Sequence, residues 1–118
     1  MIKVIGDVML DSWIEGDCDR VSPETPVIVF KEKTKDYNLG GAGNLALNLS
    51  SLGTDTWLYG AVGEDIAGQK IIEILRKNKI TSRVCQDAEM TTTKTRMVGQ
   101  NGHHLLRVDK EQVYAKIT

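Results

Sequence analysis

Glycine and alanine occupy residues 40–43, and an apolar repeat follows them at once; this junction constrains the fold more than any other feature of the chain. The repeat has the spacing of a helix with one buried stripe, and Gly53 stands where a glycine commonly ends a helix. Its members are Leu45, Ala46, Leu49 and Leu52. Glycine accepts backbone conformations and close approaches that a Cβ forbids. The junction therefore predicts a helix that starts at a tight glycine loop, which a ligand can approach.

Three interpretations of this loop compete. Residues 41–46 fit the dinucleotide fingerprint G-x-G-x-x-[G/A], and Glu64 and Asp65 follow at a suitable spacing for a ribose-binding acid. That interpretation needs a core strand directly before the loop, whereas the polar residues 33–38 precede it. A phosphate loop is excluded because no Gly-Lys-Ser/Thr follows. A plain turn before a helix remains, but Asn44 favours a ligand loop, because an amide in the first helical turn both donates and accepts hydrogen bonds, as a polyol requires.

The rest of the chain alternates predicted strands and helices, which indicates an α/β fold with parallel βαβ units and a side layer of antiparallel strands. Residues 12–26, with two prolines, are expected to be irregular, and 31–38 form a polar stretch. Asn101-Gly102 is a strong hairpin signal. Strands are predicted at 2–10, 27–30, 56–62, 92–100 and 103–109, and helices at 44–52, 64–78 and, at its start only, 111–117.

The composition excludes several classes of function. The 118 residues form one globular domain or part of one, and the net charge of −1 without a long charged run argues against nucleic-acid and membrane partners. No apolar run approaches the roughly 20 residues of a membrane span, so the cytoplasm is the expected location. Cys18 and Cys85 are expected to be reduced thiols. His103 and His104 are adjacent, so in a strand they point to opposite faces and cannot share a metal.

The glycine loop, with its spacings to Gly53 and Gly63, resembles the first signature of the PfkB (ribokinase-like) carbohydrate kinases. The segment Gly6-Asp7-x-x-x-Asp11 is also similar to that family. Within the family the chain most resembles the kinase domain that phosphorylates heptose 7-phosphate in ADP-heptose biosynthesis, and the resemblance covers essentially all of its length. The stretches that carry this finer resemblance are residues 20–27, Thr93-Lys94-x-Arg96 and Arg107-Val108-Asp109.

The resemblance implies a sugar-binding site at the ends of the core strands, under a lid of β-strands. Asp11 matches the acid that binds sugar hydroxyls, and Arg96 and Lys94 would hold the phosphate already on the substrate. A solvated strand face is the alternative for Arg96, and Trp13 is expected in the lid core. The substrate-contacting loop would be Gly40, Gly41 and Asn44. The core would comprise residues 1–12, 38–90 and 110–118, and the lid 13–37 and 91–109.

The family implies ATP and Mg²⁺ as cofactors, and a catalytic base in a Gly-Ala-Gly-Asp loop of the C-terminal half. No such loop follows Gly63, so we expect an N-terminal kinase portion without a catalytic residue, without bound cofactor or metal, and inactive alone. A sheet cut short would self-associate, and lids of the family often pair in homodimers. Two alternatives stay open: a stand-alone sugar-phosphate-binding or dimerisation module, and a portion of a kinase for another sugar or nucleoside.

Overall fold

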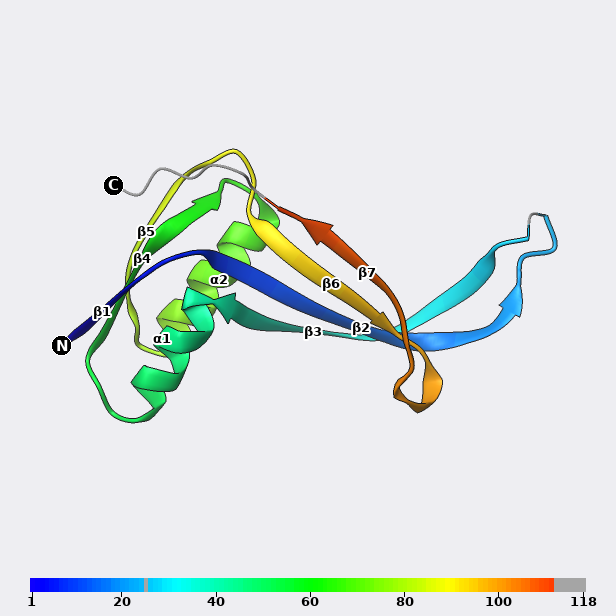
Figure 1. The fold of residues 1–118 in the computed structure, drawn as a ribbon, viewed down its shortest axis with the longest axis horizontal. Coiled ribbons are helices and arrows are strands. Elements are labelled where there is room, and N and C mark those ends of the chain that lie inside the picture. The colour runs from blue at the N-terminus through cyan, green and yellow to red at the C-terminus, as the bar shows by residue number, and fades with distance from the viewer. Residues whose placement is uncertain (25, 112–118) are drawn as a thin grey trace.

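The computed structural model describes residues 1–24 and 26–111, which form two β-sheets and two α-helices in an elongated molecule of 56 × 30 × 17 Å (Figure 1). The parallel sheet has the strand order β1-β4-β5, and the four-stranded sheet has the order β3-β2-β6-β7. In chain order the elements are β1 (Ile2–Ile5), β2 (Val8–Val21), β3 (Ile28–Gly41), α1 (Ala42–Ser51), β4 (Thr56–Gly63), α2 (Ile66–Lys77), β5 (Thr81–Ala88), β6 (Thr92–Val98), the 3-10 turn η1 (Gln100–Gly102) and β7 (His104–Lys110).

The core lies between the parallel sheet and the two helices, which cover the side of this sheet that is turned toward the four-stranded sheet (Figure 1). Alternate residues of β4 are buried against the helices, as expected for a strand with one covered face. On α2, Ile71 and Leu75 lie one turn apart and are fully buried, as the helical period predicts. The helices predicted at 44–52 and 64–78 are confirmed as α1 and α2, as is the strand at 56–62.

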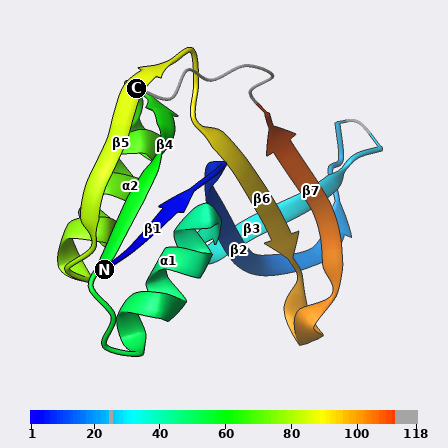
Figure 2. The same cartoon turned by 60° about the vertical axis from the view of Figure 1, so that its left-hand side comes forward.

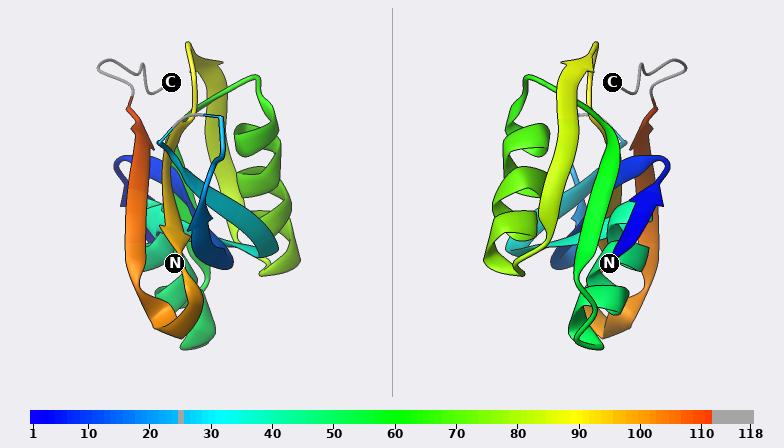
Figure 3. Two further views of the ribbon diagram at one scale, coloured as in Figure 1. Left: turned by 90° about the vertical axis from the view of Figure 1, so that its right-hand side faces the viewer. Right: turned by 90° about the vertical axis from the view of Figure 1, so that its left-hand side faces the viewer.

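The opposite face of the parallel sheet is turned toward the viewer in the right-hand view of Figure 3. Two basic side chains lie over its aromatic rings: Lys3 Nζ is 5.9 Å from the ring centroids of Trp57 and Tyr59, and the guanidinium carbon of Arg83 is 5.0 Å from that of Trp57. Ile5, on the outer strand β1, is 66% exposed. No helix of the described residues covers this face.

The N-terminal strand predicted at 2–10 is two strands in two different sheets. β1 pairs in parallel with β4, whereas β2 pairs antiparallel with β3 and parallel with β6. The break falls at Gly6 and Asp7, where the chain leaves the parallel sheet and enters the four-stranded sheet (Figure 2). Backbone hydrogen bonds from Gly6 N to Tyr59 O (3.3 Å) and from Ala42 N to Asp7 O (2.8 Å) hold this junction.

The prediction of irregular chain over residues 12–26 was wrong, because β2 continues to Val21, and the polar stretch 31–38 lies inside β3. These strands carry polar side chains because they pair mainly with each other, so backbone hydrogen bonds rather than burial maintain them. The outer strand β5 was missed for a related reason: its sequence is polar. The hairpin at Asn101-Gly102 is confirmed, with positive φ at both residues. The helix expected at 111–117 lies, apart from its first residue, outside the described residues.

Candidate functional site

One face of the four-stranded sheet collects most of the side chains that the sequence singled out. Asp11 on β2 is the Cα partner of Asn38 on β3 and of Lys94 on β6, and Trp13 is the partner of Arg96. Directly paired residues project to the same side of a sheet, and so do residues two apart along a strand. We call this side, with Asp11, Trp13, Lys94 and Arg96, the polar face.

Asp11 has a carboxylate oxygen that its surroundings leave unsatisfied. Its Oδ1 atom is buried, makes no hydrogen bond to a described residue, and lies 3.9 Å from Arg96 Nη1, too far for a direct hydrogen bond. A Cβ at Gly40 would lie 3.1 Å from this oxygen and 2.7 Å from Met9 Cγ. Glycine at position 40 therefore leaves room for a carboxylate that is still able to accept a hydrogen bond.

Arg96 is held by an aromatic neighbour and is not a freely solvated side chain. Its guanidinium carbon lies 5.4 Å from the centroid of the Trp13 ring, and only 24% of the side chain is exposed. The Trp13 ring in turn meets the ring of His104 edge to face, at 5.4 Å between centroids and 79° between planes. Stacking of this kind orients a guanidinium while its N–H groups stay available. The His104 contact was not predicted from the sequence.

The polar face continues onto β7, and none of the predicted site residues lies on that strand. Arg107 is the Cα partner of Arg96, and Asp109 is the partner of Lys94. Arg107 Nη2 donates a hydrogen bond to Asp109 Oδ2 at 2.9 Å, so these two charges largely compensate each other. The sequence did point to Arg107 and Asp109 in one way: they belong to a stretch that resembles the heptose 7-phosphate kinase domain.

Gly41 and Asn44 lie at the start of α1. Gly41 is the N-cap residue with a φ of +59°, and a Cβ there would lie 2.4 Å from the carbonyl oxygen of Asp7. The site therefore requires glycine at this position. Asn44 is exposed in the first turn of the helix, and no hydrogen bond within the described part of the chain joins it to Asp11 or Arg96. The structure thus brings Asp11, Gly40 and Arg96 together and leaves Asn44 facing solvent.

Asp65 has a structural position that rules out the ribose-binding role in the dinucleotide interpretation. It caps α2 by accepting from Gly68 N (2.8 Å), and it accepts from Thr91 N (2.9 Å) and Thr91 Oγ1 (2.5 Å). Thr91 Oγ1 itself accepts from Gly63 N at 2.9 Å. Burial opposes ionisation of Asp65, but the hydrogen bonds from Thr91 and Gly68 outweigh it and hold the pKa of the carboxyl below its ordinary value. We call Gly63, Asp65, Gly68 and Thr91 the Asp65 cluster.

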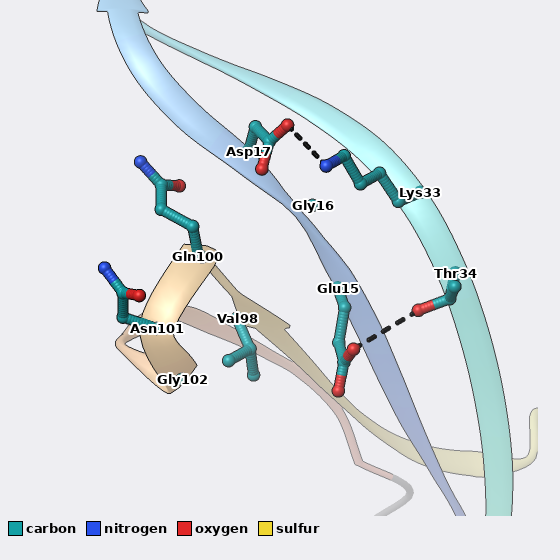
Figure 4. A pocket seen from close by; sticks show the side chains of 10 residues that line it. Glu15, Gly16, Asp17, Lys33, Thr34, Val98, Gln100, Asn101 and Gly102 are labelled. Carbon is teal, nitrogen blue, oxygen red and sulfur yellow. Dashed lines mark hydrogen bonds and ion pairs between the residues drawn. The ribbon is translucent and has the colours of Figure 1, made fainter.

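A cavity of about 300 Å³ lies at the far end of the four-stranded sheet, between the β2–β3 ribbon and the turn η1 (Figure 4). Its charged groups are already paired: Asp17 Oδ2 is 2.8 Å from Lys33 Nζ, and Glu15 accepts a hydrogen bond from Thr34. The hydrogen bond and the charge of Asp17 raise the pKa of Lys33. None of the residues predicted for the sugar site lines this cavity.

Within residues 1–24 and 26–111, no group of three His, Cys, Asp or Glu side chains is placed to hold a metal ion. Cys18 and Cys85 form no disulfide. None of the described helices is long and apolar enough to cross a membrane.

Comparison with known proteins gives relatives for nearly the whole chain. Bifunctional protein HldE of Helicobacter pylori (strain HPAG1) is 45% identical over 112 residues, which cover 93% of this chain and 24% of HldE. D-beta-D-heptose 7-phosphate kinase of Bordetella bronchiseptica is 41% identical over 112 residues, which cover 94% of this chain and 36% of that kinase. The chain thus spans about a quarter to a third of the length of these relatives.

Solved structures give the fold. A carbohydrate kinase from Agrobacterium tumefaciens superposes with a TM-score of 0.69 at 18% identity, covering 92% of this chain and 34% of that one. Arabidopsis thaliana ribokinase, solved with ribose and ATP, superposes with a TM-score of 0.68 at 21% identity, covering 92% and 35%. These likenesses confirm the predicted ribokinase-like α/β fold. The family model for pfkB family carbohydrate kinases matches residues 1–115, and the chain belongs to this family.

Proposed function

We propose that this chain is the sugar-binding, N-terminal portion of an ATP-dependent carbohydrate kinase that acts on heptose 7-phosphate or a closely similar sugar phosphate. Membership of the pfkB family supports the reaction class, and two relatives above 40% identity, a heptose 7-phosphate kinase and HldE, support the substrate class. The four-stranded sheet would act as the lid over the sugar, with its polar face toward the substrate.

The observation that carries the proposal is the unsatisfied Oδ1 atom of Asp11. A buried acceptor without a partner costs about 1–3 kcal/mol, and a sugar hydroxyl that donates to it would remove that cost. Gly40 supports the same role, because a side chain there would crowd the carboxylate. A hydroxyl donor at this position is what a polyol substrate supplies.

Arg96 and Lys94 would bind the phosphate that the substrate already carries. They lie on the same face as Asp11, and Arg96 offers the planar fork of donors that suits a phosphate. The Trp13 ring orients this fork, and Asp11 lies beside it. The two anchors together would fix one end of the sugar by its hydroxyls and the other by its charge, which holds the acceptor in one orientation.

ATP would supply the phosphoryl group, and Mg²⁺ would neutralise charge on its phosphates. The described residues offer no set of three acidic or imidazole ligands for such an ion. We propose that the nucleotide site, the metal site and the base belong to a part of the kinase outside this chain, as the resemblance to the family implies. The residues present here bind and orient the acceptor sugar, and the N-terminus of α1 provides a positive end near the glycine loop.

The proposal is tested by calorimetric titration of the chain with heptose 7-phosphate, fructose 6-phosphate and ribose. We expect heptose 7-phosphate to bind most tightly, and Asp11→Asn to weaken its binding by roughly tenfold or more, because the amide presents a donor where the hydroxyl needs an acceptor. Asp87→Asn, an exposed acid on β5, is the matched control and should bind as the unchanged chain does. Preference for ribose would favour a kinase for another sugar, and binding of none of the three would refute the site.

Purified alone, the chain should show no sugar-dependent ATP turnover, since we place the catalytic base elsewhere. Turnover by the 118 residues would overturn this part of the proposal. A coding sequence that continues into a Gly-Ala-Gly-Asp loop would support the kinase portion, whereas a non-catalytic sugar-phosphate-binding module would bind ligand without such a continuation.

ATP and sugar phosphates are cytoplasmic metabolites, so we place the function in the cytoplasm. We also propose a homodimer formed through the four-stranded sheet.

A further inference from the structure

The side of the four-stranded sheet opposite the polar face holds a second cavity that the proposed sugar site does not use. It has a volume of about 200 Å³ and lies where α2 approaches the sheet. Its polar lining consists of four hydroxyl side chains and two lysines: Ser12, Tyr37, Thr93, Thr95, Lys35 and Lys70. Strand alternation separates this lining from Asp11 and Lys94, which project to the other side.

The strand register places these hydroxyls next to one another. Ser12 is the Cα partner of Tyr37 on β3 and of Thr95 on β6, so the three side chains form one row across three strands. Thr93 lies two residues before Thr95 and faces the same side. Four side chains that carry a hydroxyl, from three strands, therefore line the same small cavity.

None of the four hydroxyls makes a hydrogen bond within the part of the chain that the structure describes. Ser12 is only 5% exposed as a residue, yet its hydroxyl stays accessible, because Asp11 Oδ1 is the one buried side-chain atom without a partner among the described residues. The four hydroxyls are therefore free to form hydrogen bonds with a ligand that enters the cavity.

The two lysines give the cavity a positive charge that no described acid neutralises. Lys35 Nζ and Lys70 Nζ lie 5.4 and 5.0 Å from the centroid of the Tyr37 ring, one from the sheet and one from α2. Neither forms an ion pair with a described residue, and no acidic side chain lines the cavity. Lys70 is half-buried, so its charge is less screened than that of a free surface lysine.

We propose that this cavity binds a phosphoryl group, either as inorganic phosphate or as the phosphate of a small phosphomonoester. Hydroxyl donors and ammonium groups without a competing carboxylate match a compact oxyanion that has several acceptor oxygens. The site lies on the opposite side of the sheet from Asp11 and Arg96, so it does not depend on the proposed sugar site. Its occupancy would link the sheet to α2, because Lys35 and Lys70 would share one anion.

The test is a titration of the full chain with sodium phosphate against sodium chloride at matched ionic strength, followed by calorimetry and by amide chemical shifts. We expect saturable phosphate binding, with shifts centred on Ser12, Thr93 and Thr95. Lys35→Gln with Lys70→Gln should weaken phosphate binding by roughly tenfold or more, because both ammonium partners are lost. Lys77→Gln, an exposed lysine at the end of the same helix, is the matched control and should leave it unchanged.

Three further variants separate this site from the sugar site. Arg96→Gln and Asp11→Asn should leave the phosphate-induced amide shifts at Ser12, Thr93 and Thr95 intact, whereas Ser12→Ala, a small change in a folded strand, should weaken phosphate binding in the cavity. Binding of a sugar phosphate but not of inorganic phosphate, with the same dependence on Lys70, would identify the source as a phosphomonoester. Absence of binding for both, or loss of the shifts at Ser12, Thr93 and Thr95 in Arg96→Gln, would refute the proposal while leaving the sugar site to its own test.

Discussion

Gly41 combines an unusual backbone conformation with a very close neighbour. Its φ is +59°, and a Cβ would lie 2.4 Å from Asp7 O. Gly41→Ala should lower the free energy of unfolding by at least about 1–3 kcal/mol, the range for backbone strain alone. Gly53→Ala is the matched control, since Gly53 has a φ of +88° but open space around its Cβ position. Its cost should be about 1–2 kcal/mol from conformation only. Equal losses in urea unfolding would show that the contact with Asp7 adds nothing.

At the scale of single residues, the resemblance to the family named the residues of the predicted site but not their contacts. Asp11 and the sugar-contacting role of the glycine loop were predicted from that resemblance, and the structure puts Gly40 against the Asp11 carboxylate. The contacts of Arg96 with Trp13, and of Trp13 with His104, join separate strands. Such pairs depend on register between strands, which a single sequence does not reveal.

The Asp65 cluster links three elements: the end of β4, the start of α2 and the residue before β6. Glycine is required twice in it, because a Cβ at Gly68 would lie 2.3 Å from Gly63 O, and one at Gly63 would lie 2.8 Å from Met90 Cα. The last glycine of the family signature therefore serves the junction between the helix layer and β6. The start of β6 determines where Lys94 and Arg96 stand along that strand.

The lowered pKa of Asp65 predicts a dependence of stability on pH. A carboxyl with a folded-state pKa below 3.8 stabilises the protein at pH values above its unfolded-state pKa, and this stabilisation is lost as the pH falls toward the folded-state value. Asp65→Asn should therefore cost about 1–3 kcal/mol at neutral pH and less in acid, because both carboxylate oxygens accept hydrogen bonds and the amide keeps only one acceptor oxygen. Urea unfolding at neutral and acid pH measures both. Asp87→Asn should show little change, and a cost for Asp65→Asn that is constant with pH would contradict the assignment.

At the scale of elements, periodicity predicted both helices because each buries one stripe against a sheet. It did not predict the length of β2 and β3, since their outer parts form a ribbon with few buried side chains. The two prolines, Pro23 and Pro26, lie at the tip of this ribbon, between the two strands. The polar, proline-containing stretch that was expected to be irregular is therefore the outer part of a β-hairpin. Pairing between distant strands, rather than composition, determined the outcome.

At the scale of the whole molecule, the described residues leave one face of the parallel sheet open, and this predicts self-association. Ile5 is 66% exposed on the outer strand β1, on the same face as Trp57 and Tyr59. Exposed strand edges and apolar faces favour pairing with a second copy. Light scattering over a concentration series should therefore show species larger than the dimer proposed through the four-stranded sheet, and Ile5→Glu should reduce them to that dimer. Leu52→Glu, at a leucine after α1 that is 80% exposed, is the control. A wild-type chain that stays dimeric or monomeric throughout would refute this expectation.

For the molecule as a whole, the sequence predicted the α/β class and the family, because a glycine signature of fixed spacing covers residues 40–63. It did not predict the division into two sheets within the first strand. An apolar run such as residues 2–10 looks like one buried strand whether or not the chain changes sheet inside it. The change of sheet follows from strand pairing: β1 pairs with β4, whereas β2 pairs with β3 and β6.

The chain changes sheet at Gly6 and Asp7, and a hinge at this short junction would turn the four-stranded sheet relative to the parallel one. Along β2, Asp11 lies about 13 Å from this hinge and Val21 about 45 Å, at the usual rise per residue. A swing of the four-stranded sheet would thus carry the outer end of the ribbon roughly three times as far as it carries Asp11. The arm could open widely to admit a substrate while its innermost carboxylate stayed near the glycine loop. Asp11, the acid that would bind the sugar, would therefore move least when the sheet swings.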